Sequence, residues 1–484
     1  MTKVDFDDMQ GLVRFGHGRL VEAEFLLLKV ADRNAARAWL FDAPIASAAT
    51  QSTLPDSALQ IAFSAEGLRA FDLSDDIVAQ FSQPFLSGMG AENSRSRRLG
   101  DTGTNDPEGW RWKEADAHIL LMLYGERDGL EAFRASIKDA RFHKAFETVQ
   151  SLQTQPNSGV EPFGFADGIS EPKIDWEQSR PPSKHGRETY SNLIAPGEVI
   201  LGHPNEYDEI SPSPSVETDG GFENADRHDL GANGTYLVLR QLQQDVPGFW
   251  QFLDLATEGD AERRENLAAK MVGRHRDGTP LMNNRCDISG GRPANNFTYD
   301  DDINGVVCPL GAHIRRANPR TGDIPPGNNG ILRWLLSTLG FRRRPDKLPG
   351  RHDLVASTRF HRLVRRGRAY GPQLSPEEAI SKGSDEERGL FFICLCADIV
   401  RQFEFVQNAW MASGRFDGLT GEADPLLGNR APIGGAATGG FTIQTARGVP
   451  EHHANLPQFV TVKGGGYFFM PGLKALRYIA TTAS

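Results

Sequence analysis

Residues Glu22 to Val30 read E-A-E-F-L-L-L-K-V, a continuous apolar run that predicts a buried strand. Asp32 follows as the expected N-cap of a helix over residues 34–41, because its short side chain can accept from the first free amide groups. The same order returns at residues 117–124 before Asp128, at 235–240 before Asp245, and at 390–396 before a helix over 397–410. Two such units in each half predict two similar α+β domains, each a sheet covered by helices, although any α/β chain alternates strands and helices.

The segments between these units set the expected domain boundaries. We predict an N-terminal domain over residues 1–186, a C-terminal domain over 228–484, and a polar crossing loop over 187–227. A second irregular stretch, residues 321–353, contains one short amphipathic piece over 331–341. Loops of this length inside a compact protein usually serve a function or are mobile.

Composition narrows the class of protein. With 484 residues and a net charge of -10, the chain can bury large cores but has no overall basic character for nucleic acid or an anionic membrane. The N-terminus has no apolar core of a secretory signal, and no segment approaches the roughly 20 apolar residues that span a bilayer. Four cysteines without C-x-x-C spacing, Cys286, Cys308, Cys394 and Cys396, predict free thiols. We therefore expect a cytoplasmic protein.

Residues Glu161 to Lys173, E-P-F-G-F-A-D-G-I-S-E-P-K, hold Asp167 between two glycines. Glycines allow a sharp turn and a close approach of the backbone to a flat ligand, which indicates more than a solvated surface role for Asp167. The alternative is an ordinary turn aspartate that caps its own backbone.

A second stretch, Cys308 to Arg320, reads C-P-L-G-A-H-I-R-R-A-N-P-R. A lone histidine is more often a core or surface residue than a ligand, but small residues precede His313 and three arginines follow it: Arg315, Arg316 and Arg320. An axial ligand beside fixed positive charge is what haem, with its iron and two propionates, requires.

Two further stretches carry charge beside apolar residues. Phe360 to Pro372 has four arginines, which predict either a half-buried strand whose arginines meet carboxylates or an exposed edge strand protected by charge. Arg388 to Gln407 is an apolar strand followed by a helix, and Asp398 lies at their junction. Asp398 is either the N-cap of that helix or the carboxylate that hydrogen-bonds a metal-ligating histidine.

In order and context, four of these motifs resemble the dye-decolourising peroxidases: G-F-A-D-G at 164–168, C-P-L-G-A-H-I-R-R-A-N-P-R at 308–320, L-V-R-R-G at 363–367, and R-G-L-F-F-I-C at 388–394. The resemblance implies two ferredoxin-like α+β domains with antiparallel sheets and one haem b buried in the C-terminal domain. The long segment between His313 and Arg365 and the extra C-terminal length resemble the longer, elaborated branch of the family.

The resemblance also implies roles for individual residues. His313 would ligate the iron, and Asp167 and Arg365 would be the catalytic pair on the opposite face. Asp398 would be the carboxylate behind His313. The haem would also contact these residues: Gly168, Ile169, Ser170, Asn318, Pro319, Arg320, Arg365, Leu390 and Phe392.

The expected reaction is reduction of hydrogen peroxide and one-electron oxidation of aromatic substrates, by a monomer or homodimer without nucleic-acid or membrane partners. A carboxylate base with an intrinsic pKa near 3.9 stays ionised in acid, so turnover should be best at acidic pH. Bulky dyes cannot enter a pocket lined by Leu390 and Phe392, so electrons are expected to travel from surface aromatic residues or along a propionate channel. Trp334, Tyr370 and Trp410 are the aromatic candidates, although packing is the commoner role of each.

Two other classes compete with this interpretation. A haem carrier or sensor could use the same pocket, but it would need no acid-base and cation pair on the open face. A zinc hydrolase could combine His313 with His361 or with His452 and His453, but none of these has the helical H-x-x-x-H spacing. The K-G-G-G run at residues 463–466 lacks the ending of a phosphate-binding P-loop, which argues against nucleotide binding.

Overall fold

A computed structural model describes residues 3–50, 54–179, 190–216, 228–282, 295–321, 355–381, 386–432, 435 and 437–481. The predicted amphipathic piece over 331–341, Trp334 and Cys286 lie outside the described residues, as do parts of the predicted crossing loop.

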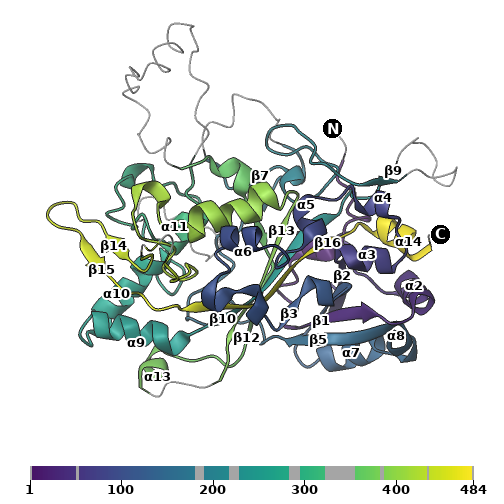
Figure 1. Cartoon of the computed structure of the whole chain (residues 1–484), viewed down its shortest axis with the longest axis horizontal. Helices are drawn as coiled ribbons and strands as arrows, with labels where there is room; N and C mark the ends of the chain where they lie inside the picture. Colours follow the sequence, from purple (N-terminus) through teal and green to yellow (C-terminus); the bar gives the residue numbers. More distant parts are fainter. Residues whose placement is uncertain are drawn as a thin grey trace, which may run out of the picture.

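Within the described residues, the centre of the molecule is one sheet of ten strands (Figure 1). One half of this sheet runs in the order β2 (Ser57–Phe63), β4 (Ile119–Gly125), β1 (Glu22–Val30), β5 (Phe146–Gln153). The other half runs β11 (Val364–Arg365), β13 (Gly389–Cys396), β10 (Thr235–Gln244), β16 (Val460–Met470), and β12 (Arg368–Tyr370) also pairs with β13. These neighbours are all antiparallel; only the short β3 (Trp112–Lys113) pairs in parallel, with β16.

The two halves have the same strand order. Numbered along the chain within each half, the strands lie in the order second, third, first, fourth, which is the ferredoxin-like βαββαβ arrangement. The predicted α+β class with antiparallel sheets is therefore confirmed, with one difference: β16 pairs with β2 at Phe469 and Phe63, so the two sheets join into one.

Helices cover the sheet at both ends of the molecule. In the N-terminal half these are α2 (Arg33–Asp42), α7 (Leu130–Ile137) and α8 (Ala140–Ala145), and in the C-terminal half α9 (Val246–Ala256) and α10 (Ala261–Val272) (Figure 1). The predicted N-cap Asp32 is confirmed, because it accepts from the amide of Ala35 at 2.8 Å, and Asp245 likewise accepts from that of Gly248 at 2.9 Å. Asp128 does not cap α7, whose N-cap is Gly129. The last described helix, α14 (Leu473–Thr481), packs against α2 of the N-terminal half.

The continuous apolar run of β1 is explained by burial on both faces of the sheet. Leu26 and Leu28 belong to one apolar cluster, whereas Phe25 and Leu27 belong to another that also contains strands of the C-terminal half. The ring of Phe25 lies 6.1 Å from that of Phe391, edge to face. The two halves therefore share a core.

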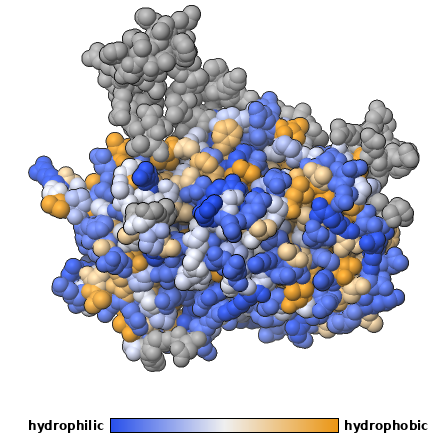
Figure 2. All heavy atoms as spheres, in the orientation of Figure 1, coloured by the Kyte–Doolittle hydropathy of each residue, from blue (hydrophilic) through white to orange (hydrophobic). Residues whose placement is uncertain are grey.

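The outer surface has the mixture of hydrophilic and apolar residues that is usual for a globular protein. The face drawn in Figure 2 is mainly hydrophilic, and apolar residues on it are scattered singly or in small groups. Of the helices in the described part of the chain, none is both long enough and apolar enough to cross a membrane.

Candidate active site

The turn that carries Asp167 is held from inside by a carboxylate. Glu161 accepts from the amides of Phe163 and Phe165 at 3.1 and 2.9 Å, and from the side chain of Gln244 on β10 at 2.9 Å. Burial raises the pKa of Glu161 to about 7. Gly164, with a φ of 97°, turns the chain in a region that favours glycine. Sequence analysis did not single out Glu161, although it begins the quoted stretch.

Asp167 lines a cavity and faces an arginine. Its Oδ1 lies 3.4 Å from Nη1 of Arg365, and it also accepts from the amide of Gly168 at 2.7 Å. The backbone amide of Asp167 donates to the carbonyl of Gly159 at 2.8 Å. Asp167 therefore makes the local turn contact of the alternative interpretation, and it also meets a cation from a distant strand, while its catalytic role stays a prediction.

Arg365 is fixed by a second carboxylate. Its Nε lies 2.8 Å from Oε1 of Glu171, and its backbone amide donates to Oε2 of the same residue at 2.9 Å. Burial disfavours the charge, but Glu171 and Asp167 outweigh it and raise the pKa of Arg365. The other arginines of this stretch meet carbonyl groups instead; Arg366, for example, donates to Leu12 and Val13. Only part of the predicted pattern of arginine and carboxylate pairs is therefore present.

His313 begins α11 (His313–Ala317) and lines the same cavity. Its Nδ1 lies 3.0 and 3.1 Å from the two carboxylate oxygens of Asp424, which is fully buried. Burial favours neutral forms of both groups, but their attraction is stronger, so the pKa of His313 is raised and that of Asp424 is lowered. A carboxylate only accepts, so Nδ1 carries a proton, and Nε2 is the ring nitrogen that Asp424 does not engage.

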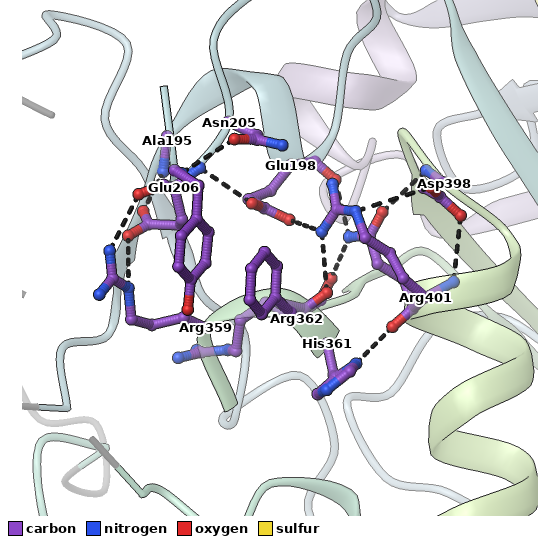
Figure 3. Close-up of polar contacts among 12 residues, drawn as sticks. Ala195, Glu198, Asn205, Glu206, Arg359, His361, Arg362, Asp398 and Arg401 are labelled. Carbon is purple, nitrogen blue, oxygen red and sulfur yellow. Dashed lines mark hydrogen bonds and ion pairs between the residues drawn. The ribbon is translucent and has the colours of Figure 1, made fainter. Parts of the chain in front are cut away.

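The prediction that Asp398 supports His313 is wrong. Oδ1 of Asp398 accepts from the amide of Arg401 at 3.0 Å, and Oδ2 lies 3.7 Å from the Arg401 side chain (Figure 3). Asp398 therefore bonds an amide in the first turn of the π-helical segment Val400–Glu404, one residue before its N-cap Ile399, which is close to the capping role that its place at the junction also suggested. Asp424 lies 111 residues from His313 in an irregular segment, and no local pattern connects the two.

Comparison with known proteins identifies the family. Residues 41–156 match the family model described as the DyP dimeric alpha+beta barrel domain. The multifunctional dye peroxidase DyP2 of Amycolatopsis sp. is 30% identical over 411 residues, which cover 78% of this chain and 74% of that protein. The chain belongs to the dye-decolourising peroxidases.

Further members of the family match over most of their length. Dye-decolorizing peroxidase msp1 of Mycetinis scorodonius is 29% identical over 454 residues, covering 88% of this chain and 77% of its own. The crystal structure of a fungal DyP-type peroxidase from Auricularia auricula-judae aligns with a TM-score of 0.73 at 25% identity and covers 99% of this chain and 100% of its own. A dye-decolorizing peroxidase solved in complex with 2,6-dimethoxyphenol has the same TM-score at 24% identity, which bears on the fold alone.

The cavity of this peroxidase lies between the sheet and α11. Three strands form its apolar wall, with Leu390 and Phe392 from β13, Leu242 from β10, and Val460 and Val462 from β16. Of the other residues predicted to contact haem, Ile169, Ser170, Asn318 and Arg320 line the cavity, whereas Gly168 and Pro319 do not. Their contact with haem stays a prediction.

Positive charge gathers at one end of the cavity. Arg274, Arg320 and Arg362 line it, and the guanidinium groups of Arg320 and Arg362 lie 5.4 and 5.2 Å from the ring centre of Tyr190. Burial lowers the pKa of Arg274 to about 10, so it stays charged at neutral pH. An apolar cavity with a free histidine nitrogen and such a cluster fits the iron, the ring and the two propionates of haem.

Two arginines predicted to serve the cofactor have structural roles instead. Arg315 is fully buried and pairs with Asp302 at 3.0 Å, and Arg316 is fully buried and donates to the carbonyls of Trp410 and Glu422. Both side chains hold α11 in place and neither lines the cavity.

Tyr370, Trp410 and the cysteines are the other residues that the sequence analysis named. Tyr370 is buried and stacks on Phe391 with ring centres 4.5 Å apart, while Trp410 lines the cavity. Cys308, Cys394 and Cys396 are free and buried. Across the described ranges, no group of three or more His, Cys, Asp or Glu side chains could hold a metal ion, so the zinc-hydrolase alternative lacks a ligand set there.

Proposed function

We propose that this chain is a haem peroxidase that reduces hydrogen peroxide and oxidises organic molecules such as dyes and phenols in one-electron steps. The observation that supports it best is the presence, on one cavity, of the Asp167–Arg365 pair and of His313 with its Asp424 partner. A protein that only carried haem would have no use for an acid-base group beside a fixed cation.

The proposed cofactor is one haem b, with Nε2 of His313 as the iron ligand and the cluster of Arg274, Arg320 and Arg362 facing the propionates. The contact between Nδ1 of His313 and Asp424 increases the electron density on Nε2, which favours the oxidised forms of a bound iron. Haem, when bound, would supply the redox chemistry, taking two oxidising equivalents from each peroxide.

The chain's own residues would manage the protons. Asp167 would accept the proton of one peroxide oxygen and return it to the other oxygen, which leaves as water. Arg365, held by Glu171, offers a fixed positive charge where negative charge develops as the bond between the oxygens breaks. Overall, one peroxide, two electrons and two protons give two waters, and each of two substrate molecules loses one electron.

Asp167→Asn tests this mechanism, because it keeps the shape of the side chain and removes its ability to accept a proton. The rate of reaction of the haem-loaded enzyme with peroxide, followed by stopped-flow absorption, should fall by about 10²–10⁴-fold. Asp128→Asn is the matched control, since Asp128 is an exposed turn aspartate with a φ of 64°, a conformation that asparagine tolerates. Equal rates in wild type and Asp167→Asn, at equal haem content, would favour the carrier alternative.

The finer expectations stay proposals. These are a cytoplasmic location, a monomer or homodimer as the working form, and the domain ranges 1–186 and 228–484.

A further inference from the structure

Glu161 lies on the same short ribbon as Asp167, and on the same face of it. Two antiparallel segments form this ribbon, because Val160 bridges to Ala166. In this register Glu161 stands opposite Phe165, so Glu161 and Asp167 are diagonal neighbours whose Cα atoms lie about 7–8 Å apart. Both side chains line the cavity. A charge on Glu161 would therefore be felt at the proposed acid-base group.

The carboxyl group of Glu161 is held by three uncharged donors. Oε2 accepts from the amide of Phe163 at 3.1 Å and from Nε2 of Gln244 at 2.9 Å, and Oε1 accepts from the amide of Phe165 at 2.9 Å. Oε1 has only this one bond, so it can carry a proton and still accept from Phe165. The group is thus fixed in position whether or not it is ionised.

Most of the charged side chains around the ribbon belong to other pairs. On the surrounding elements these groups are Arg240 on β10, Arg274, His275 and Arg276 after α10, His313 on α11, and Arg365 on β11. Four of them lie within ion-pair distance of another carboxylate: Arg240 of Asp101, Arg276 of Glu265, His313 of Asp424, and Arg365 of Glu171. From α9, the uncharged Trp250 donates to the carbonyl of Phe163 at 3.1 Å. In the part of the chain that the structure describes, no cation pairs with Glu161.

Without a cation, the charge of Glu161 is costly. Burial, helped by the like charge of Asp167, outweighs the three hydrogen bonds and raises the pKa of Glu161 to about 7. The carboxyl group is therefore mostly neutral in weak acid and mostly ionised in weak base. Once ionised, it adds a second negative charge beside Asp167, and this charge opposes the stabilisation of anions by Arg365.

We propose that Glu161 is a positioning residue that works in its protonated form, and that its ionisation makes the Asp167 side of the cavity unfavourable for anions. This inference rests on the proposed peroxidase function. It gives the expected preference for acidic pH a second cause besides the aspartate base: the fixed charge of Arg365 acts fully on a developing negative charge only while Glu161 holds its proton.

Infrared spectroscopy tests the protonation of Glu161 without turnover. The carbonyl stretch of a protonated carboxyl group is separate from that of a carboxylate. At pH 6 the wild-type spectrum minus the Glu161→Gln spectrum should contain this band, and the band should disappear through a midpoint near pH 7. Glu131→Gln is the matched control, because the side chain of Glu131 is 76% exposed, and its difference spectrum should lack the band at pH 6.

Fluoride binding to the haem-loaded resting enzyme, followed by absorption, tests the effect on anions. Between pH 6 and pH 8 the affinity of wild type should fall about tenfold more than that of Glu161→Gln, because only wild type gains the extra negative charge. Glu131→Gln should behave like wild type. The rate of reaction with peroxide should show the same difference between wild type and Glu161→Gln.

Gln244→Leu provides a test that leaves Glu161 itself in place. It removes one donor to the ionised carboxylate, so the pKa of Glu161 should rise further. The midpoint of the infrared band and the fall in fluoride affinity should both move to higher pH by about one unit. A side chain that only held the turn together would not produce this shift.

Three results would overturn the proposal. They are a difference spectrum without the protonated band at pH 6, a fall in fluoride affinity that is the same in wild type and Glu161→Gln, and an unchanged midpoint in Gln244→Leu. Failure of the proposed function would be distinct from these. It would show as a chain that takes up no haem, or as a haem-loaded chain that does not react with peroxide, while the infrared band of Glu161 still titrates.

Discussion

His313 and His361 line one cavity, yet their second nitrogens have different partners. Nδ1 of His313 meets a buried carboxylate, and the pKa of the ring is raised; Nδ1 of His361 meets a neutral carbonyl, and burial lowers the pKa of the ring to about 4. The first arrangement suits a strong metal ligand, and the second suits an acceptor of weak donors. The role of a histidine is thus set by a contact that its own sequence neighbours do not reveal.

Asp424→Asn should weaken haem binding about 10–100-fold, because an amide cannot support the basicity of the His313 ring as a carboxylate does. The measurement is the rate and extent of haem transfer to an acceptor protein. Asp398→Asn is the control: asparagine caps helices as well as aspartate, so this variant should keep its haem. The corrected assignment would be contradicted if Asp398→Asn lost haem and Asp424→Asn retained it.

A functional residue can be predicted from one sequence when it belongs to a local motif. Asp167, His313 and Arg365 stand in recognisable stretches, and the structure brings all three to one cavity. Asp424 and Glu171 are defined by partners 111 and 194 residues away, and pairing over such distances cannot be deduced from one sequence. Arg315 and Arg316 show a different error. The sequence suggested that these arginines beside His313 serve the cofactor, but their side chains hold the protein backbone instead.

At the scale of elements, apolar runs and caps were enough to predict strands and helices, because burial and capping are local in sequence. For the K-G-G-G run of β16, the sequence excluded a phosphate-binding loop but predicted no structural role. Its reason is packing against the segment that contains β3: a Cβ at Gly464 would lie 2.4 Å from the ring of Trp112, and one at Gly465 2.6 Å from the sulfur of Met89. Sequence could not show that another segment crosses β16 so closely.

Gly464→Ala should therefore destabilise the protein by about 1–3 kcal/mol, since the ring of Trp112 is buried, bonded to Gln241 at 2.9 Å, and unable to give way. Thermal unfolding followed by circular dichroism measures the effect as a lower Tm. Gly109→Ala is the control, because no atom lies within 4 Å of the added carbon and the residue is exposed. Equal Tm values for the two variants would show that β3 can move away from β16.

The two halves of the molecule have the same strand order, and the repeated strand-helix units of the sequence predicted two similar halves. It did not anticipate how the halves interlock behind the cavity. Residues 99–102 of the N-terminal half accept from two side chains of the C-terminal half: Gln407 donates to Leu99 at 2.9 Å, and Asn429 donates to Gly100 at 2.7 Å. Asp101 adds an ion pair with Arg240 on β10. The cavity is thus closed by both halves, and its stability should depend on these contacts.

The Asp101–Arg240 pair gives the sharpest test of that dependence, because both side chains are almost completely buried. Asp101→Ala leaves the charge of Arg240 without a partner in the interior, which should cost about 3–5 kcal/mol in the free energy of unfolding, measured by urea denaturation. Asp75→Ala removes a pair that Arg69 makes with a side chain 87% exposed, and should cost less than about 1 kcal/mol.

The cost of Asp101→Ala should also depend on pH. Burial, opposed by Arg240, raises the folded pKa of Asp101 to about 6, above its unfolded value of about 3.8. Between these values the folded state holds more protons than the unfolded state, so wild type loses stability as the pH rises through this window. The difference between wild type and Asp101→Ala should therefore shrink from about pH 4 to pH 6 and stay constant above it. A difference that grew over this range would mean that the pair holds the halves together mainly as ions, with the pKa of Asp101 lowered by Arg240 and not raised by burial.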